Sequence, residues 1–265
     1  MKLRIVVCIK PVPDPAKWDK LKLDPETMLL CRNEIPAVIN PLDRTAIEQA
    51  VSLKEKFGAT VSVLTMAVPD AEEQLREALA MGCDRACLLT DKAFAGADTL
   101  ATARVIAAAV RKLGRFDLIF CGGYSLDGST SQVGPQVAEL LDIPELTHVF
   151  KLKLRGGALE AHCRLESGHA VYAAQLPALL TLDKEANSPR LADMRGIGRA
   201  VGKSVTRWSA RDLKLSPSKV GLKGSPTQML NVYTPAVGRK GEILQGTADE
   251  AVCELIVRLQ KEKVL

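Results

Sequence analysis

The sequence of 265 residues predicts an α/β fold, in which a parallel sheet with helices on both faces is followed by an antiparallel ribbon and an extended arm. Three observations predict it. In the first half of the chain, short apolar runs alternate with segments of helical period, which is typical of βαβ units. Strict alternation of apolar and polar residues then indicates half-buried antiparallel strands. The last third has little periodicity until a final amphipathic segment. The parallel part is therefore expected to be Rossmann-like.

Five apolar runs are expected to form the parallel strands, because strands that are buried on both faces lack polar alternation. They are Leu3–Ile9, Thr60–Met66, Ala86–Leu89, Phe116–Cys121 and, after the ribbon, Ala178–Leu182. Right-handed crossovers place every loop that leaves such a strand at one edge of the sheet, where ligands bind. We therefore expect one crevice to be lined by Lys10–Pro13, Met66–Pro69, Gly96–Thr99 and Gly122–Val133.

The helices between these strands have recognisable ends. Asn40-Pro41 predicts a helix start, with Asn as the N-cap and Pro in the first turn. Gly58 is expected to end that helix. Asp70 is expected to cap the second helix, and Asp98 or Thr99 the third.

The chain is expected to divide into two functional parts. Residues 1–183 are expected to form the nucleotide-binding α/β part, with the ribbon at about 146–175. The irregular stretch 16–38 is expected to contain a short hairpin around Leu23 and Met28. Residues 184–265 form a partner-docking loop and a C-terminal arm. The final helix, Ala251–Leu259, has one apolar face, and we expect another chain to cover it.

Composition excludes several classes of function. No apolar run reaches the length of about 20 residues that a membrane span needs, and a net charge of +5 with few aromatic residues does not favour nucleic-acid binding. Seven scattered cysteines without a CxxC pair indicate buried thiols in the cytoplasm. Three histidines without ligand-like spacing predict no metal site. Without a nucleophile motif or a carboxylate pair, no catalytic residue is expected, so a bound cofactor would supply the chemistry.

The segment Cys121–Pro135 carries the strongest local signal. It joins a buried strand to a helix and holds four glycines, which permit close approach of the backbone to a ligand. Ser129, Thr130 and Ser131 lie where the N-cap of the helix is expected, and the free N–H groups at a helix start attract an anion. The segment therefore predicts a phosphate cradle. The alternative is an ordinary strand-to-helix turn with a capped helix.

The segment Lys184–Arg211 carries seven basic residues and two acidic ones. Such a segment can attract an acidic partner electrostatically, although an ordinary solvated loop would have the same composition. Within it, Arg195–Gly202 imitates a dinucleotide-binding fingerprint. No strand precedes it and its last spacing is wrong, so we do not assign it that role.

Several motifs together resemble the β subunit of the electron-transfer flavoproteins, over the whole chain and in register. They are Val6–Asp14, Asn40–Asp43, Gly96–Ala103, Leu126–Pro135, Leu176–Ala178, Asn187–Arg190 and Gly224–Gln228. The resemblance implies an adenine-nucleotide-hydrolase-like fold and a heterodimer with an α subunit that carries FAD. It also implies an adenine nucleotide in the crevice.

The resemblance leaves two branches open. In the ordinary branch the nucleotide is a structural AMP. In the electron-bifurcating branch it is a second FAD, which NADH reduces, and one electron then passes to the α-subunit FAD and another along a more reducing path. Asp127–Pro135 and Gly224–Thr227 look like the bifurcating version. Gly123-Tyr124 departs from the family, which usually has a basic residue and Gln there. A flavin-dependent acyl-CoA dehydrogenase is the implied acceptor.

The resemblance and the predicted crevice assign a set of residues to the cofactor. They are Cys8, Ile9, Lys10, Pro11, Asn40, Met66, Asp98, Thr99, Cys121, Gly122, Asp127, Gly128, Thr130, Ser131, Gln132, Val133 and Gly134. The Thr130 hydroxyl is expected to bind phosphate, and Gly134 to leave room for the ligand.

The family also docks partner dehydrogenases through a loop after the Asn-x-Pro-Arg motif, where a large apolar residue inserts into the partner. Met194 matches that residue, and its flexible thioether suits several partners. The docking residues implied are Arg190, Met194, Arg195, Ile197 and Arg199. The rival class is a stand-alone ATP-binding or adenylating protein on a similar sheet, which would not need the arm.

Overall fold

The computed structural model describes residues 3–20, 35–155, 158–228, 230 and 241–265. It divides into two compact units, Met1–Met229 and Leu230–Leu265. The expected hairpin around Leu23 and Met28 lies outside the described residues.

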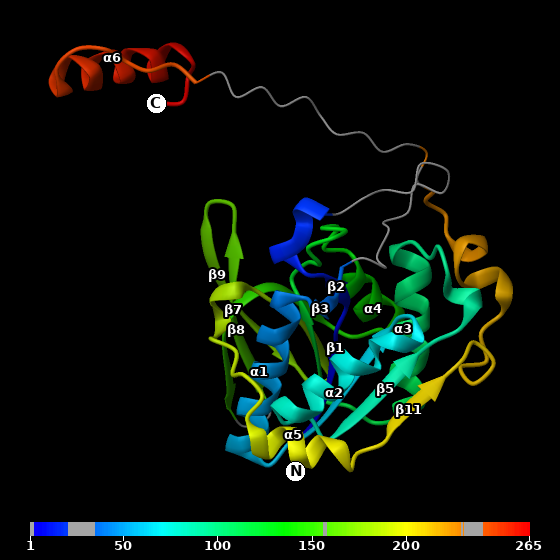
Figure 1. Cartoon of the computed structure of the whole chain (residues 1–265). Coiled ribbons are helices and arrows are strands. Elements are labelled where there is room, and N and C mark those ends of the chain that lie inside the picture. The colour runs from blue at the N-terminus through cyan, green and yellow to red at the C-terminus, as the bar shows by residue number, and fades with distance from the viewer. Residues whose placement is uncertain (1–2, 21–34, 156–157, 229, 231–240) are drawn as a thin grey trace. The chain divides into compact units, whose positions relative to one another are not determined.

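A mixed sheet of nine strands forms the centre of the first unit, in the order β11-β5-β4-β1-β6-β10-β7-β8-β9 (Figure 1). Neighbours from β11 to β7 are parallel, and β7, β8 and β9 are antiparallel, so the predicted ribbon extends the main sheet. The strands are β1 Arg4–Cys8, β4 Thr60–Met66, β5 Arg85–Leu89, β6 Leu118–Gly122, β7 Glu145–Arg155, β8 Ala158–Leu165, β9 Gly168–Gln175, β10 Ala178–Leu182 and β11 Val205–Trp208. A separate pair, β2 Pro11–Pro13 and β3 Ala37–Ile39, is antiparallel.

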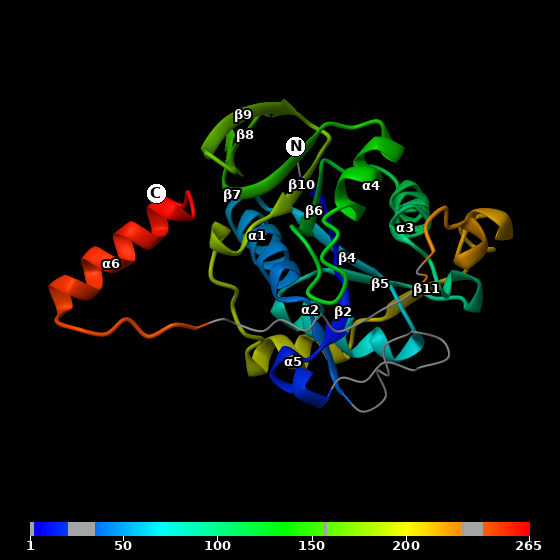
Figure 2. The same ribbon diagram turned by 90° about the horizontal axis from the view of Figure 1, so that it is seen from above.

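Helices cover both faces of the sheet, which confirms the predicted α/β class. Figure 2 shows α1, α2 and α5 on one face and α3 and α4 on the other. The helices of this unit are α1 Pro41–Phe57, α2 Glu72–Met81, α3 Thr99–Leu113, α4 Val133–Leu141 and α5 Met194–Val201. Short 3-10 turns are η1 Pro15–Lys20, η3 Pro69–Ala71, η4 Lys92–Phe94, η5 Lys184–Ala186, η6 Pro217–Lys219 and η7 Leu222–Gly224. Alternate residues of β1 enter the two cores, with Val7 on the α1 side and Val6 on the α3 side.

The helix ends follow the sequence in part. Gly58 ends α1 in the left-handed conformation, and the Asp98 carboxylate caps α3 by accepting from Ala101 N–H, both as predicted. The prediction for Asp70 is wrong, because that residue lies inside η3 and Ala71 is the N-cap of α2. Asn40 stands at the N-cap of α1, but its side chain makes no capping hydrogen bond.

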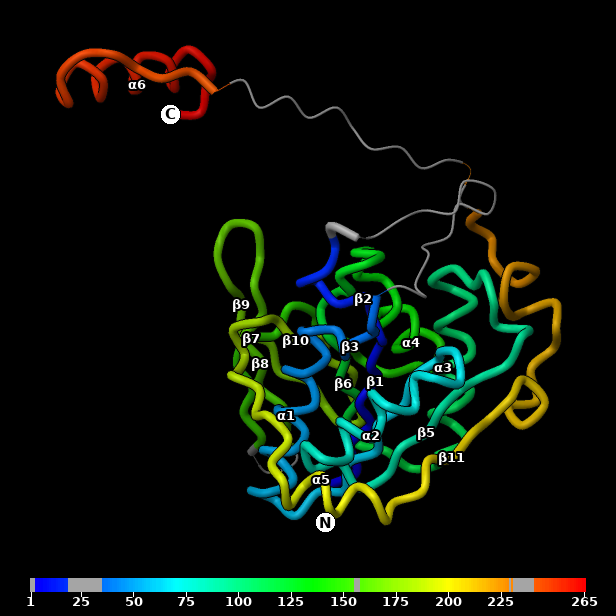
Figure 3. Tube along the Cα trace, viewed as in Figure 1, coloured from blue at the N-terminus to red at the C-terminus, as the bar shows by residue number. Residues whose placement is uncertain are grey.

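Residues 184–228 are more ordered than their weak periodicity indicates. Strand β11 pairs with β5, and α5 packs against α2. A β-carbon on Gly196 would lie 2.2 Å from the Ala80 carbonyl oxygen, so only glycine lets α5 approach so closely. These residues belong to the first unit (Figure 3), whereas the functional division after residue 183 stays a prediction.

The second unit contains the predicted terminal helix, α6 Ala248–Lys261. Thr247 and Glu250 form a capping box at its start. None of its residues is buried, and Val252, Leu255 and Ile256 are exposed on a helical i, i+3, i+4 pattern. A search of the described helices found none with the length and apolar character needed to cross a membrane.

Candidate functional site

A cavity of about 400 Å³ lies at the carboxyl ends of β1, β4 and β6. The chain runs from β1 through β4 to β5 in one direction, and from β6 to β10 in the other, so β1 and β6 flank the switch point of the sheet. Ligands of open α/β sheets bind at this point. Figure 2 looks onto this end of the sheet, where α1, α3 and α4 begin.

The structure brings most of the predicted cofactor residues together in the lining of this crevice. They are Cys8, Ile9, Lys10, Asn40, Met66, Asp98, Thr99, Cys121, Gly122, Gly128, Thr130, Ser131, Gln132, Val133 and Gly134. Two predicted residues are not in the lining. Pro11 pairs with Ile39 in the small β2–β3 sheet, and Asp127 lies beneath the surface with its side chain 4% exposed.

Asn40 fixes the loop that follows β6. Its side-chain Nδ2 donates to the Tyr124 carbonyl over 2.8 Å, and its Oδ1 accepts from Leu126 N–H over 3.2 Å. An amide supplies both a donor and an acceptor, so it can replace a backbone partner for the loop. This use explains why the buried Asn40 side chain does not cap α1.

Lys10 ties the end of β1 to the same loop. Its Nζ lies 2.6 Å from Asp127 Oδ1 and 3.2 Å from Ser125 Oγ. Lys10 is the one lysine or arginine in the described lining of the crevice. Because Asp127 already neutralises it, anion binding here depends mainly on N–H groups.

The loop reaches α4 through two left-handed residues, Ser129 with φ 48° and Ser131 with φ 55°. This conformation is uncommon outside glycine, and such strain concentrates at functional sites. Turns that combine left-handed and other residues gather N–H groups into concavities that bind anions. The predicted capping role of the serines is wrong, because Gln132 is the N-cap and makes no side-chain capping bond.

Three helices point their N-termini at the crevice: α1 after Asn40, α3 after Asp98 and α4 after Gln132. The Thr99 hydroxyl donates to Gln132 Oε1 over 3.0 Å and so joins the starts of α3 and α4. First-turn N–H groups, such as that of Val133 in α4, have no partner within their own helix. The crevice is therefore an environment that favours a negative charge.

Two lining glycines allow helices to pack against the sheet. A β-carbon on Gly134 would meet Thr181 Cγ2 at 2.7 Å, and one on Gly122 would lie 2.4 Å from Asp43 Oδ1. The structure thus gives Gly134 a packing role against β10, which differs from the predicted role of leaving room for a ligand. By contrast, a β-carbon on Gly128 would make only ordinary contacts, 3.4 Å from Ser125 Oγ and 3.7 Å from Lys10 Nζ.

Asp43 is the central residue that the sequence interpretation missed. It lies in the first turn of α1 and bridges the two strands at the switch point, because its carboxylate accepts from Lys10 N–H over 2.7 Å and from Gly122 N–H over 3.0 Å. Burial raises the pKa of Asp43 to about 7, although hydrogen bonds from Lys10, Asn40 and Gly122 oppose this. The sequence signal that could have identified Asp43 is its position in the first helical turn after Asn40.

Asp98 connects the crevice to the motif at Gly224–Gln228. Its carboxylate accepts from Thr227 N–H over 3.0 Å, and its own N–H donates to Ser225 Oγ over 2.8 Å. Burial opposes ionisation, but hydrogen bonds from Ala101 and Thr227 hold the pKa of Asp98 below its usual range. The carboxylate is therefore an anion that orders the chain around the crevice.

Other lining residues were not among those assigned to the cofactor. Ala97, Gly123, Tyr124 and Ser125 lie in the segments expected to line the crevice, whereas Thr102 and Ile106 were missed. Tyr124 stands where the resemblance expects Gln, after Gly123 in place of a basic residue, and its side chain is partly exposed at the crevice. Loops place such residues through tertiary hydrogen bonds, which no local pattern reports.

Cys121 of the crevice is a poor nucleophile. Cys8 and Cys121 lie on the neighbouring strands β1 and β6. A hydrogen bond with the Cys8 thiol, and burial, raise the pKa of Cys121 well above its ordinary value. In the part of the chain that the structure describes, no cluster of histidine, cysteine and acidic residues could hold a metal ion.

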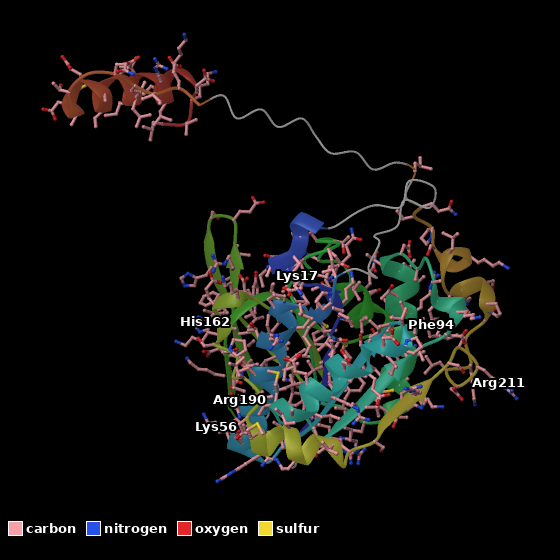
Figure 4. All side chains as sticks on the ribbon, viewed as in Figure 1. Lys17, Lys56, Phe94, His162, Arg190 and Arg211 are labelled. Atoms are coloured by element: carbon pink, nitrogen blue, oxygen red, sulfur yellow. The ribbon has the colours of Figure 1, made fainter. Side chains whose placement is uncertain are left out.

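The predicted docking residues occupy two environments. Arg190, labelled in Figure 4, is held by α1, since its Nε lies 2.7 Å from Glu48 Oε2 and its Nη1 2.5 Å from Glu55 Oε1. Hydrogen bonds that Arg190 donates to the Glu55 and Glu48 carboxylates raise the pKa of Arg190. Arg190 therefore anchors the loop to α1.

Helix α5 presents the remaining docking residues to solvent. Gly196 and Ala200 are buried on its inner face. Met194 is 82% exposed and Ile197 46%, and Arg195 and Arg199 are exposed beside them. Such an unpaired apolar group with flanking cations is a surface suited to a protein partner.

Comparisons with known proteins agree on one family. Residues 27–213 match the electron transfer flavoprotein domain. The chain is 44% identical over 264 residues to "Electron transfer flavoprotein subunit beta" of Thermoanaerobacterium thermosaccharolyticum, covering 99% of this chain and 100% of the relative. It is 42% identical over 262 residues to "Caffeyl-CoA reductase-Etf complex subunit CarD" of Acetobacterium woodii, covering 98% and 99%. It is 40% identical over 270 residues to "Acryloyl-CoA reductase electron transfer subunit gamma" of Anaerotignum propionicum, covering 99% and 100%.

Proposed function

The chain belongs to the electron transfer flavoprotein β-subunit family, and we propose that it binds FAD in the crevice and passes electrons to the FAD of an α subunit. One observation carries the proposal: three helix N-termini and a loop with two left-handed serines converge on one cavity at the switch point of the sheet. This arrangement suits a pyrophosphate. The bound flavin would supply the redox chemistry, and the residues of the crevice would bind and orient it.

The residues of the crevice would each contribute to binding. The loop N–H groups and the Thr130 hydroxyl would hold the pyrophosphate, and Asn40 would fix the loop that carries them. Lys10 is already paired with Asp127, so it would contribute little net positive charge to the binding of the pyrophosphate. Asp43 would hold the ends of β1 and β6 at the spacing that the ligand needs.

AMP is the second candidate for the crevice. The same cradle suits its single phosphate, and Gly123-Tyr124 replaces the basic residue and Gln that the family usually places at the flavin end. A cavity of about 400 Å³ is within the range of small-molecule sites and favours neither nucleotide by itself.

The partners follow from two unpaired surfaces. We assign the apolar face of α6 to the α subunit, and the outer face of α5 to a flavin-dependent acyl-CoA dehydrogenase. Relatives whose names include caffeyl-CoA reductase and acryloyl-CoA reductase support this class of partner. We further propose NADH as the electron donor, in the bifurcating manner, and a cytoplasmic location.

The test uses the αβ complex with Thr130→Val and Gly128→Ala combined. The first change removes a hydroxyl from the lining, and the second adds a methyl group that the protein itself tolerates. Thr206→Val, on the exposed edge strand β11, is the matched control. We expect two flavins per heterodimer in the control and one in the double variant, measured by absorbance. One flavin in both, with AMP lost from the variant, would favour AMP. Unchanged nucleotide content would remove this loop as the site.

A further inference from the structure

We propose a second anion site at the opposite, amino-terminal edge of the sheet, which binds the phosphate group of a small phosphorylated molecule. A hollow of about 400 Å³ lies there between the starts of β1, β4 and β5 and the end of α3. Its lining consists of Arg4, Ile5, Val6, Thr60, Ser62, Arg85, Leu113 and Arg115. The lining combines three guanidinium groups, two hydroxyl groups and apolar side chains.

Strand register brings the polar residues of this hollow together. Arg4 pairs with Thr60 on the neighbouring strand, and Ser62 pairs with Arg85 on the next. Side chains two residues apart on a strand share a face, so Thr60 and Ser62 lie on the same side of β4. Val6, which pairs with Ser62, belongs to the core beneath α3, and this places the set on the α3 face.

The charges in the hollow favour an anion. Asp117 is the acidic residue beside it, and its carboxylate already accepts from Arg4 N–H over 2.8 Å and from Arg115 Nη2 over 3.3 Å. No ion pair is found for the side chains of Arg4 and Arg85 within the described residues. Guanidinium groups in the lining of a hollow can donate charge-assisted hydrogen bonds to a phosphate group.

An ordinary structural role explains Arg115 but not the other two arginines. The C-terminus of α3 attracts cations, and Arg111 and Lys112 already lie in its last turn. Arg4 and Arg85 begin strands, where no helix dipole calls for a positive charge. A solvated basic surface would also not need a cavity, and a volume of about 400 Å³ with Val6 and Leu113 in its lining exceeds the need of a bare ion.

The hollow is separate from the crevice. Arg4 and Cys8 are the first and last residues of β1, and a strand rises roughly 3.3 Å per residue. The two sites therefore lie at opposite ends of the same strand. A ligand of the hollow can be titrated while the nucleotide of the crevice remains bound.

The experiment titrates the cofactor-loaded αβ complex with ribose 5-phosphate and with inorganic phosphate by calorimetry. We expect saturable binding of ribose 5-phosphate, tighter than that of phosphate. The double variant Arg4→Gln and Arg85→Gln should weaken it about tenfold or more, because charge-assisted hydrogen bonds are lost. The control, Arg164→Gln with Arg211→Gln, removes the same charge from exposed sites elsewhere in the first unit and should bind normally.

Nucleotide content reports whether each variant is folded. If the arginine variant loses its nucleotide, Thr60→Val with Ser62→Ala tests the same hollow without changing its charge, and weaker binding is again expected. The proposal is overturned if ribose 5-phosphate shows no saturable binding to the wild-type complex. It is also overturned if the folded variants of the hollow bind as tightly as the control.

Discussion

At the scale of the residue, the crevice depends on two buried polar side chains of α1 that hold other parts of the chain. Asn40 supplies the partners of the loop after β6, and Asp43 joins the ends of β1 and β6. Each side chain makes hydrogen bonds to backbone groups at the bottom of the cavity. Leaving those buried groups unpaired would cost free energy. Neither role can be read from a local pattern, because the partners lie more than 30 residues away in the sequence.

Asp43 gives the protein a predictable dependence on pH. Its pKa rises from 3.8 to about 7 in the fold, so the native state binds more protons than the unfolded chain between these values. The unfolding free energy should therefore fall as the pH rises from about 4 to about 7. The charged and titratable groups that face it are Lys10 and Cys121.

Asp43→Asn should remove this contribution. We would compare the pH dependence of the urea midpoint in the wild type and the variant across this range. A smaller slope in the variant is expected, since it cannot titrate at residue 43. Asp249→Asn, in the first turn of the exposed α6, is a control that should keep the wild-type slope. Equal slopes in the wild type and in Asp43→Asn would contradict the assignment.

At the scale of the element, the parallel strands and the ribbon were predictable because their hydrophobic patterns are strong. Thr60–Met66 and Ala178–Leu182 have the predicted bounds, and β7, β8 and β9 form the predicted ribbon. Helix α5 and strand β11 were not predicted. α5 contains two glycines, which are poor helix formers, and β11 is four residues long, so tertiary packing decides both.

The position of α5 leads to a prediction about docking. Met194→Ala with Arg195→Ala should slow electron delivery to the partner dehydrogenase several-fold and leave nucleotide content unchanged, because both side chains point to solvent. Steady-state transfer rates with the dehydrogenase and flavin absorbance are the measurements. Arg164→Ala, on β8, is the control. Loss of nucleotide from the double variant would move this surface into the cofactor site.

Gly196 offers a second test of the same element. Because its β-carbon would overlap the Ala80 carbonyl, Gly196→Ala should displace α5 from α2 and slow transfer without removing either exposed docking side chain. Gly198→Ala, which meets no atom within 4 Å, should be tolerated. Equal transfer rates for the two variants would show that the seating of α5 on α2 is unimportant.

At the scale of the whole molecule, the sequence predicted a crevice and a C-terminal arm. The crevice lies in the first compact unit, and α6, at the end of the arm, lies in the second. The crevice could be predicted because loops that leave parallel strands converge. The partner that covers α6 could not be predicted, because an exposed apolar face does not specify what binds to it. The separate apolar face remains the best sign that the chain works in a complex.

Removing α6 should abolish assembly. We expect that a chain without residues 241–265 no longer co-purifies with its α subunit, and that Leu255→Gln with Ile256→Gln weakens the complex by at least about tenfold, since two apolar side chains would be lost from an interface. Gln260→Ala, on the same helix, is the control. A truncated chain that still forms the heterodimer would show that α6 has another role.

The central claim is that the crevice holds FAD, and counting flavin in the purified αβ complex tests it most directly. Flavin released by denaturation would be measured by absorbance against the protein concentration, with AMP determined in the same extract. The account predicts two flavins and no AMP per heterodimer. One flavin with one AMP would contradict it and assign the crevice to a structural nucleotide.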